Sequence, residues 1–292
     1  MKWIKKGQIY KPGLQPTPYK FSDNIIRIFA GFRDENGVSR VHYIDVNSSN
    51  PSKVIKVSQK PVLDIGKEGC FDDNGVVPCA VIEYKNKLYM YYAGYQLGNK
   101  VRMLIFSGLA VSSDRGETFK RYLNTPIMER TSYETLFRVI HSIVFEDGIF
   151  KVWYGGGNCF KKGKYKTLPI YDIRYGETRD LKKFDFTGTT VIPTSGDEYR
   201  VGRPYVIKDE GIYKMFFCAG SESLTYRLAY AESFDGINWI RKDKDLNIDF
   251  SKDGWDSEMM AYPAITKCNN NVYLFYNGNG YDKEGFGYAQ LL

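Results

Sequence analysis

The stretch PCAVIEYKNKLYMYYAG, residues 78–94, predicts a β-hairpin. Two runs rich in aliphatic and aromatic residues, 80–84 and 88–93, flank the polar turn Lys85-Asn86-Lys87, and Gly94 closes the second run. The same pattern occurs in TPYKFSDNIIRIFAG (17–31), HSIVFEDGIFKVWYGG (141–156), RPYVIKDEGIYKMFFCAG (203–220) and YPAITKCNNNVYLFYNG (262–278). The closing glycines are 58 to 64 residues apart. A nearly fixed period of this kind is typical of a repeat architecture.

Each repeat continues past its glycine with a further strand, a turn and a last strand. In the fourth repeat, the alternating run 228–231 precedes the polar turn Ser233-Phe234-Asp235-Gly236, as a tight hairpin requires. Four strands in up-and-down order, five times over, predict an all-β, five-bladed β-propeller that forms a single domain over residues 1–292.

The last repeat ends before its fourth strand. The N-terminal segment WIKKGQIYKP (3–12) resembles the fourth strands TFKRYLNTP (118–126) and NWIRKDKDL (238–246). We therefore expect the N-terminal segment to complete the last blade, which removes an open sheet edge.

Composition narrows the class of protein and its partners. No run of eighteen apolar residues predicts a membrane span, and the segment MKWIKKGQIY lacks the apolar run of a signal peptide. The five cysteines show no CxxC spacing, so we expect free thiols and a cytoplasmic location. The net charge of +7 suits an anionic partner, but no block of five like charges is present. We expect neither a membrane nor nucleic acid as partner, and the sequence indicates no oligomeric state.

The mouth of the channel is where we expect a site, because the innermost strands of a propeller line its channel and the loops leading into them form one rim. Charged residues and a histidine recur in the segments that lead into four of these strands. They are Glu68, Asp72, Asp73, Glu134, Arg138, His141, Asp197, Glu198, Arg200, Arg203, Asp256 and Glu258.

Glycosyl transfer requires two carboxyl groups that face each other across a sugar, one protonated and one ionised. Asp73 and Glu258 are the first such pair, because they come from different blades, and Asp256 is a third catalytic candidate. Asp72 and Glu198 are reserve acids that would otherwise contact the substrate. The alternative for residues 72–75, Asp-Asp-Asn-Gly, is a simple turn.

Arg138 and Arg203 are candidate substrate-binding residues, because a guanidinium can hold a carboxylate or phosphate through two parallel hydrogen bonds. They indicate a saccharide with negative charge, such as an acidic sugar or a sugar nucleotide; the alternative is that each pairs with a nearby acid. His141 is a further candidate, with a satisfied buried histidine as the alternative. Tyr281, like Tyr95, follows a closing glycine and could stack on a sugar face, whereas the aromatic rows of the second strands are expected to pack between blades.

No cofactor or metal is predicted. The run Gly155-Gly156-Gly157-Asn158 follows a predicted strand but precedes no helix, so it is not a phosphate-binding loop. The two histidines fall in no zinc-ligand spacing.

The motifs GCFDDNGVVP, KLYMYYAGY, RPYVI, LAYAESFDGINW, WDSEMMAYPAI and GFGYAQL resemble the five-bladed propellers of glycoside hydrolase families 32, 43, 68 and 130. They look closest to an uncharacterised bacterial branch linked to surface-polysaccharide genes. The resemblance covers nearly the whole chain. It implies catalytic carboxylates at the start of inner strands, which carries over best to Asp73 and Glu258, with Asp256 or Glu198 as a supporting acid.

The chain departs from these families in two places. The first repeat offers QPTP (15–18), without the acid that fructosidases place there, and the motif of the mannoside phosphorylases is not clearly present. The resemblance, taken together with Arg138 and Arg203, leads us to expect an enzyme that acts on a glycosidic bond of an anionic or nucleotide-linked sugar in surface-polysaccharide metabolism. The alternative is an inert propeller that binds carbohydrate or serves as a scaffold.

Overall fold

The structure, a computed structural model, describes residues 1–292 and is almost entirely β-sheet. One sheet contains β2 (Leu14–Lys20), β3 (Ile25–Arg33), β4 (Ser39–Asn47) and β5 (Val54–Val57). The next contains β6 (Val76–Tyr84), β7 (Lys87–Leu97), β8 (Met103–Ser112) and β9 (Lys120–Arg121). The only helix, α1 (Asp243–Leu246), has four residues, and no helix is long and apolar enough to cross a membrane.

A larger sheet follows, and it has two halves. The first half contains β10 (Phe137–Glu146), β11 (Ile149–Lys162), β12 (Thr167–Thr178) and β13 (Thr189–Ile192). The second half contains β14 (Arg200–Asp209), β15 (Ile212–Gly220), β16 (Tyr226–Ser233) and β17 (Ile240–Arg241). The halves are joined through a single parallel pair, Tyr171 with Arg200.

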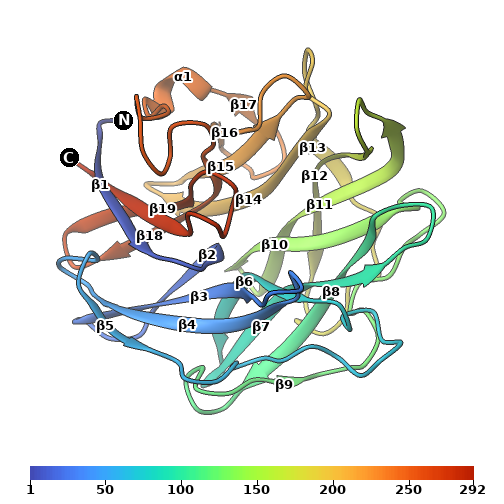
Figure 1. Ribbon diagram of the computed structural model, residues 1–292, viewed down its shortest axis with the longest axis horizontal. Coiled ribbons are helices and arrows are strands. Elements are labelled where there is room, and N and C mark those ends of the chain that lie inside the picture. Colours follow the sequence, from blue (N-terminus) through green and yellow to red (C-terminus); the bar gives the residue numbers. More distant parts are fainter.

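The last sheet joins the two ends of the chain. It contains β18 (Ala261–Cys268), β19 (Asn271–Asn277), β20 (Phe286–Leu291) and β1 (Trp3–Tyr10). β1 runs antiparallel to β20, with Trp3 opposite Leu291 and Tyr10 opposite Phe286. The predicted pairing of the N-terminal segment with the last repeat is thus present, and the two termini lie close together at the left of Figure 1.

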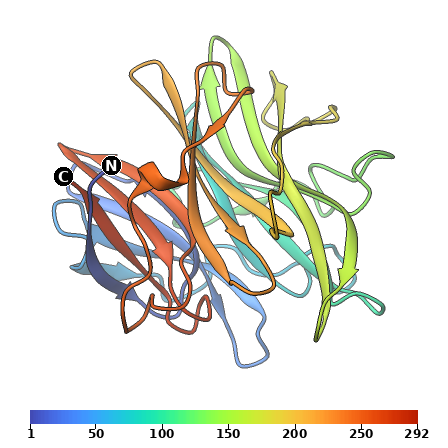
Figure 2. The same cartoon turned by 90° about the horizontal axis from the view of Figure 1, so that it is seen from above.

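The first strand of each repeat lies at the centre of the molecule. β2, β6, β10, β14 and β18 contact one another in that order, and β18 contacts β2 again. Figure 1 shows the sheets arranged around these strands, and Figure 2 shows the hairpins that extend to either side of them. The starts of the inner strands lie together at one end of this ring, as hydrogen bonds from Gln15 to Pro78 and from Arg203 to Thr17 show, and we name this end the channel mouth.

Each inner strand is irregular near its start, where its register shifts against the second strand. The residues left out of the pairing are Gln15-Pro16, Cys79, His141, Arg203-Pro204 and Tyr262-Pro263. Proline removes a backbone donor and is tolerated in a strand at such bulges. A bulge re-aims a side chain, and we name the five re-aimed residues, Gln15, Cys79, His141, Arg203 and Tyr262, the channel belt.

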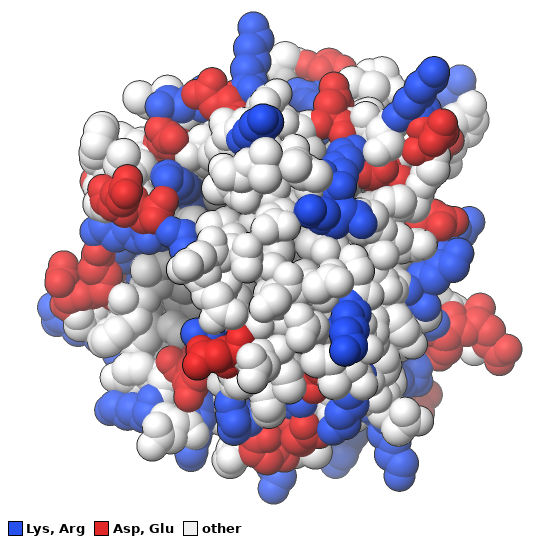
Figure 3. Space-filling model, turned by 90° about the vertical axis from the view of Figure 1, so that its left-hand side faces the viewer, with Lys and Arg blue, Asp and Glu red and all other residues white.

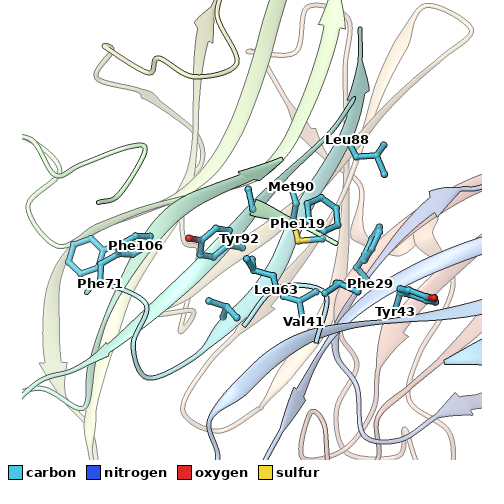
Figure 4. Packing of buried hydrophobic residues seen from close by; sticks show 13 residues of the cluster. Phe29, Val41, Tyr43, Leu63, Phe71, Leu88, Met90, Tyr92, Phe106 and Phe119 are labelled. Atoms are coloured by element: carbon cyan, nitrogen blue, oxygen red, sulfur yellow. The ribbon is translucent and has the colours of Figure 1, made fainter. Parts of the chain in front are cut away.

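The core consists of clusters between neighbouring sheets. One cluster joins Phe29 and Tyr43, from β3 and β4, to Met90 and Tyr92 of β7 (Figure 4). Tyr91 points to the other side of the same strand and joins the next cluster. The aromatic rows of the second strands thus pack between sheets, as the sequence predicted.

Candidate ligand-binding site at the channel mouth

Four acids of the mouth loops, Asp72, Glu134, Glu198 and Asp256, are buried and held in ion pairs. Asp72 is fully buried; its Oδ2 lies 2.7 Å from Arg121 Nε and accepts a hydrogen bond of 2.9 Å from the Tyr92 hydroxyl. Burial and the Asp72 charge raise the pKa of Tyr92 well above its usual value, so the phenol remains a donor. This arrangement ties the mouth loop to the second and last strands of its own sheet.

The same arrangement recurs in the last sheet and in β10–β13. Asp256 accepts a hydrogen bond of 2.9 Å from the Tyr276 hydroxyl and lies 2.8 Å from Lys5 Nζ. Glu134 occupies the equivalent place in β10–β13. It accepts from the Tyr154 hydroxyl and pairs with Arg138 at 2.7 Å and with Arg174 at 3.0 Å.

Glu198 follows the pattern without a tyrosine. Its two carboxylate oxygens accept from Arg241 at 2.9 and 3.0 Å and from Arg227 at 3.0 Å. Phe217 lies beside them, with its ring centroid 5.4 Å from the Arg241 guanidinium. The carboxylates of Asp72, Glu198 and Asp256 are therefore all occupied by bases of their own sheets.

Arg138 is occupied in the same way. Besides the Glu134 pair, it donates to the backbone oxygens of Glu129, at 3.0 Å, and of Phe186. The structure therefore agrees with the alternative given for Arg138, in which the arginine pairs with a nearby acid.

Asp73 and Glu258 lie apart from these pairs. Asp73 Oδ2 accepts from the Gly69 amide at 2.8 Å, and Asp73 lines an open groove of about 470 Å³ together with Glu68. Glu258 is exposed; its backbone binds Asn279, and its carboxylate makes no hydrogen bond or ion pair. No hydrogen bond or ion pair joins Asp73 to Glu258, and their action as a catalytic pair stays a prediction.

Arg203 lies at the centre of the channel belt and has no acid partner. It is 2% exposed, its Nη2 donates to Thr17 Oγ1 at 3.0 Å and its Nη1 donates to the His141 carbonyl at 3.3 Å. Its Nε is buried without any partner. Burial of a cation without a counter-ion costs free energy, and the burial of Arg203 accordingly lowers its pKa. Such an arrangement suits the binding of an anion.

The other belt residues surround this cation with neutral groups. His141 Nδ1 is buried without a partner, and burial together with Arg203 lowers the pKa of His141 well below 6.5. Gln15 Nε2 donates to the Pro78 carbonyl at 2.8 Å and lies 3.0 Å from Cys79 Sγ. Burial raises the pKa of Cys79 to about 11, so the thiol carries no charge at neutral pH.

A second arginine without an acid partner lies in the layer above the belt. The Arg200 guanidinium is 3.7 Å from the ring centroid of Tyr226 and 5.0 Å from that of Tyr199. Its Nε is buried without a hydrogen-bond partner. The aromatic faces hold the guanidinium by cation–π attraction and leave its donors unpaired with any acid.

Tyrosines complete this layer. The Tyr171 and Tyr226 hydroxyls share a hydrogen bond, and the rings of Tyr262 and Tyr281 stack at 5.6 Å with an interplanar angle of 23°. Tyr281 thus stacks on the belt residue Tyr262, and its contact with a sugar stays a prediction. Burial raises the pKa of Tyr95 to about 12. The mouth therefore combines aromatic faces with two cations.

Sequence reasoning selected Arg203 and counted Arg200 among the charged residues of the mouth, but it gave no role to Gln15, Cys79 and Tyr262. The dipeptides QP, RP and YP stand at equivalent places in three repeats, and a proline inside a predicted strand indicates a bulge. The sequence therefore contained a signal for the bulges that re-aim these side chains. No group of three or more His, Cys, Asp or Glu side chains lies close enough to hold a metal ion.

No protein-family model matches the chain. Among solved structures, a thermostable family-43 glycoside hydrolase is 19% identical with a TM-score of 0.73, covering 99% of this chain and 91% of that protein. A further glycoside hydrolase is 19% identical, with a TM-score of 0.70 and coverages of 98% and 91%. The α-L-arabinofuranosidase from Lactobacillus brevis is 9% identical, with a TM-score of 0.70 and coverages of 97% and 90%. The chain has the fold of these glycosidase-like propellers, which confirms the predicted resemblance.

Relatives by sequence extend over the whole chain. The uncharacterised protein MT1551 of Mycobacterium tuberculosis, strain CDC 1551, is 30% identical, and the alignment covers 100% of this chain and 99% of that protein. The uncharacterised protein Rv1502 of strain H37Rv is also 30% identical over 302 aligned residues, with the same coverages. The chain therefore belongs to the family of Rv1502.

Proposed function

We propose that this protein binds an anionic saccharide at the channel mouth of a closed, five-bladed propeller. Five blades are supported by the five hairpin repeats, by the ring of contacts among β2, β6, β10, β14 and β18, and by the β1–β20 pairing. In this proposal the channel belt lies on the axis of the propeller, where the five inner strands meet.

The observation that carries the proposal is the state of Arg203, a cation that is 2% exposed and faces no carboxylate. Arg200, one layer above, also lacks an acid partner. A carboxylate or phosphate of a ligand would supply the missing charge through hydrogen bonds that are stronger than neutral ones. An acidic sugar and a nucleotide-linked sugar both carry such a group.

The tyrosines suit the sugar itself. Tyr262 and Tyr281 are partly exposed. The ring centroid of Tyr226 lies 5.7 Å from that of Tyr262 and 6.2 Å from that of Tyr281. Aromatic rings combine apolar area with a polar end, which fits the faces and hydroxyls of a pyranose. The solved neighbours include glycoside hydrolases, which supports a saccharide as the ligand.

A second candidate function is cleavage or transfer of a glycosidic bond in that ligand. Asp73 favours it, because this carboxylate lines the open groove beside the mouth together with Glu68. Glu258, on a mouth loop of another sheet and with a carboxylate free of ion pairs, would be its partner. Asp256 would support Glu258 only by leaving its pair with Lys5.

The test is a thermal-shift screen of the wild type against acidic sugars, sugar nucleotides and neutral oligosaccharides, with Arg203→Met and Arg200→Gln in parallel. We expect stabilisation by an anionic compound that both substitutions remove. Stabilisation by neutral compounds alone would contradict the proposal. A hit is then assayed for turnover with Asp73→Asn and Glu258→Gln. Loss of turnover with retained ligand binding in these variants would support an enzyme. Absence of turnover in the wild type would support a protein that binds the saccharide without cleaving it.

A further inference from the structure

The hairpin of β11 and β12 extends beyond the channel mouth. These are the two longest strands, with 14 and 12 residues, and they remain paired outward from Gly157 opposite Tyr171 to Lys162 opposite Thr167. The hairpin lies at the upper right of Figure 1 and reaches the lower right of Figure 2. Its outer part, residues 158–168, is therefore an extension of the mouth rather than part of the core.

The tip of the hairpin is basic and aromatic. It carries Lys161, Lys162, Lys164 and Lys166, and residues 148–171 contain no acid. Tyr165 is 86% exposed, with Lys164 Nζ 5.0 Å from its ring centroid. The acid nearby, Glu222, forms an ion pair only with Lys161, at 3.5 Å. Three exposed lysines thus remain without an acid partner.

This tip is continuous with the arginines of the mouth. Lys161 Nζ lies 5.1 Å from the ring centroid of Tyr199, and the Arg200 guanidinium lies 5.0 Å from the same centroid. At the base of the hairpin, Tyr171 pairs directly with Arg200. Cations and tyrosines therefore follow one another from Arg200 to the hairpin tip, a line that we name the basic track.

We propose that the basic track binds the continuation of an acidic oligosaccharide whose end enters the channel mouth. This inference rests on the proposed function and narrows its ligand to a chain with several negative charges. A single sugar nucleotide would reach Arg200 and Arg203 but would leave the lysines of the tip unused. Regularly spaced carboxylates would engage them and would place pyranose faces against Tyr165. The face in Figure 3 carries Lys, Arg, Asp and Glu interspersed, whereas the three exposed lysines of the tip have no acid partner, so the track suits a polyanion better than that face does.

The experiment measures binding of fluorescently labelled oligogalacturonates, from the monomer to about the octamer, to the full-length protein. The triple variant Lys162→Gln, Lys164→Gln, Lys166→Gln is compared with a control triple variant, Lys53→Gln, Lys85→Gln, Lys87→Gln. The control residues are exposed, form no ion pair and lie away from the mouth. Their replacement removes the same amount of positive charge as the replacement of the three tip lysines. Arg200→Gln in the wild-type background reports on the mouth itself.

We expect the octamer to bind the wild type about tenfold more tightly than the monomer, through contacts added along the track. The triple variant of the tip should lose that gain and bind both lengths alike, while the control triple variant keeps it. Equal affinity for all lengths in the wild type, reduced by Arg200→Gln, would overturn the track but leave the mouth site in place. Absence of binding by any oligogalacturonate would overturn the track, whereas the mouth site is overturned only if the thermal-shift screen also finds no stabilising acidic sugar or sugar nucleotide. Tip-dependent binding of poly-dT or of phosphatidylserine vesicles, without binding of oligogalacturonate, would overturn the saccharide as occupant.

Discussion

Lys5 Nζ, near the N-terminus, lies 2.8 Å from Oδ2 of Asp256, a carboxylate that is 1% exposed. The pair joins β1 to the mouth loop before β18, so residues at opposite ends of the chain complete one ion pair. In β6–β9, Arg121 of β9 supplies the base for Asp72 in the same way. The N-terminal strand therefore contributes a charge to the last sheet as well as an edge.

Lys5→Met is expected to lower the free energy of unfolding by about 3–5 kcal/mol, because it leaves the Asp256 carboxylate buried without its base. Urea unfolding followed by tryptophan fluorescence measures the effect. Lys6→Met is the matched control, since Lys6 is exposed and forms no ion pair, and it should change stability little. Equal effects of the two substitutions would show that the buried pair contributes nothing specific.

Arg203→Met should leave the stability of the ligand-free protein unchanged or increase it. Replacing a buried charge with an apolar side chain of similar size removes a desolvation penalty that no acid offsets. The hydrogen bonds to Thr17 and His141 are lost, at a cost of about 1 kcal/mol each. Anion binding should disappear at the same time.

Arg121→Met is the contrasting case, and it should destabilise by about 3–5 kcal/mol because Asp72 loses its base. Both variants are compared with the wild type by urea unfolding without ligand. A similar large loss of stability in Arg203→Met would indicate that this arginine is a structural element rather than a binding residue.

Stability should fall as the pH is lowered through the usual pKa of histidine. Burial and Arg203 hold the pKa of His141 well below 6.5 in the folded protein, whereas the unfolded chain titrates near 6.5. The unfolded state therefore binds more protons below that pH, so the contribution is fully present above 6.5 and is lost as the pH falls. His42 acts in the same direction, because burial also lowers its pKa.

His141→Gln and His42→Gln separate these two contributions. Urea midpoints are compared at about pH 7 and about pH 5, above the range where most carboxylates titrate. His141→Gln should reduce the difference between the two pH values. An unchanged difference in that variant would mean that His141 is accessible to protons in the folded state.

Gly278→Ala should lower the free energy of unfolding by about 1–3 kcal/mol, because it overpacks the last sheet. A Cβ at this closing glycine would lie 2.2 Å from the Trp255 carbonyl oxygen, and the backbone cannot move away as a flexible side chain would. Gly155→Ala is the control, because its Cβ would meet only His141 atoms at 3.6 Å, an ordinary contact. Thermal unfolding of both variants provides the measurement, and a tolerated Gly278→Ala would contradict the close approach.

The closing glycines were recognised from the sequence as the end of each second strand, but the reason for them is tertiary. At Gly94 and Gly156, an added Cβ would meet Phe71 and Arg174 at 2.6 Å. In each case the side chain of another segment of the same sheet fills the space above the glycine. Spacing along the chain revealed the repeat, and close packing explains why glycine marks it.

The sequence by itself determined the all-β class, the hairpin repeat and the return of residues 3–10 to the last repeat, because alternation, turns and period are local properties that every repeat shows again. It also placed Arg203 at the start of an inner strand. Only the tertiary structure decided which charged groups have partners. Arg121, Arg241 and Lys5 come from last strands that lie far along the chain from the acids they neutralise. Arg203 and Arg200 have no such acid, and a chain position cannot show the absence of a partner in space.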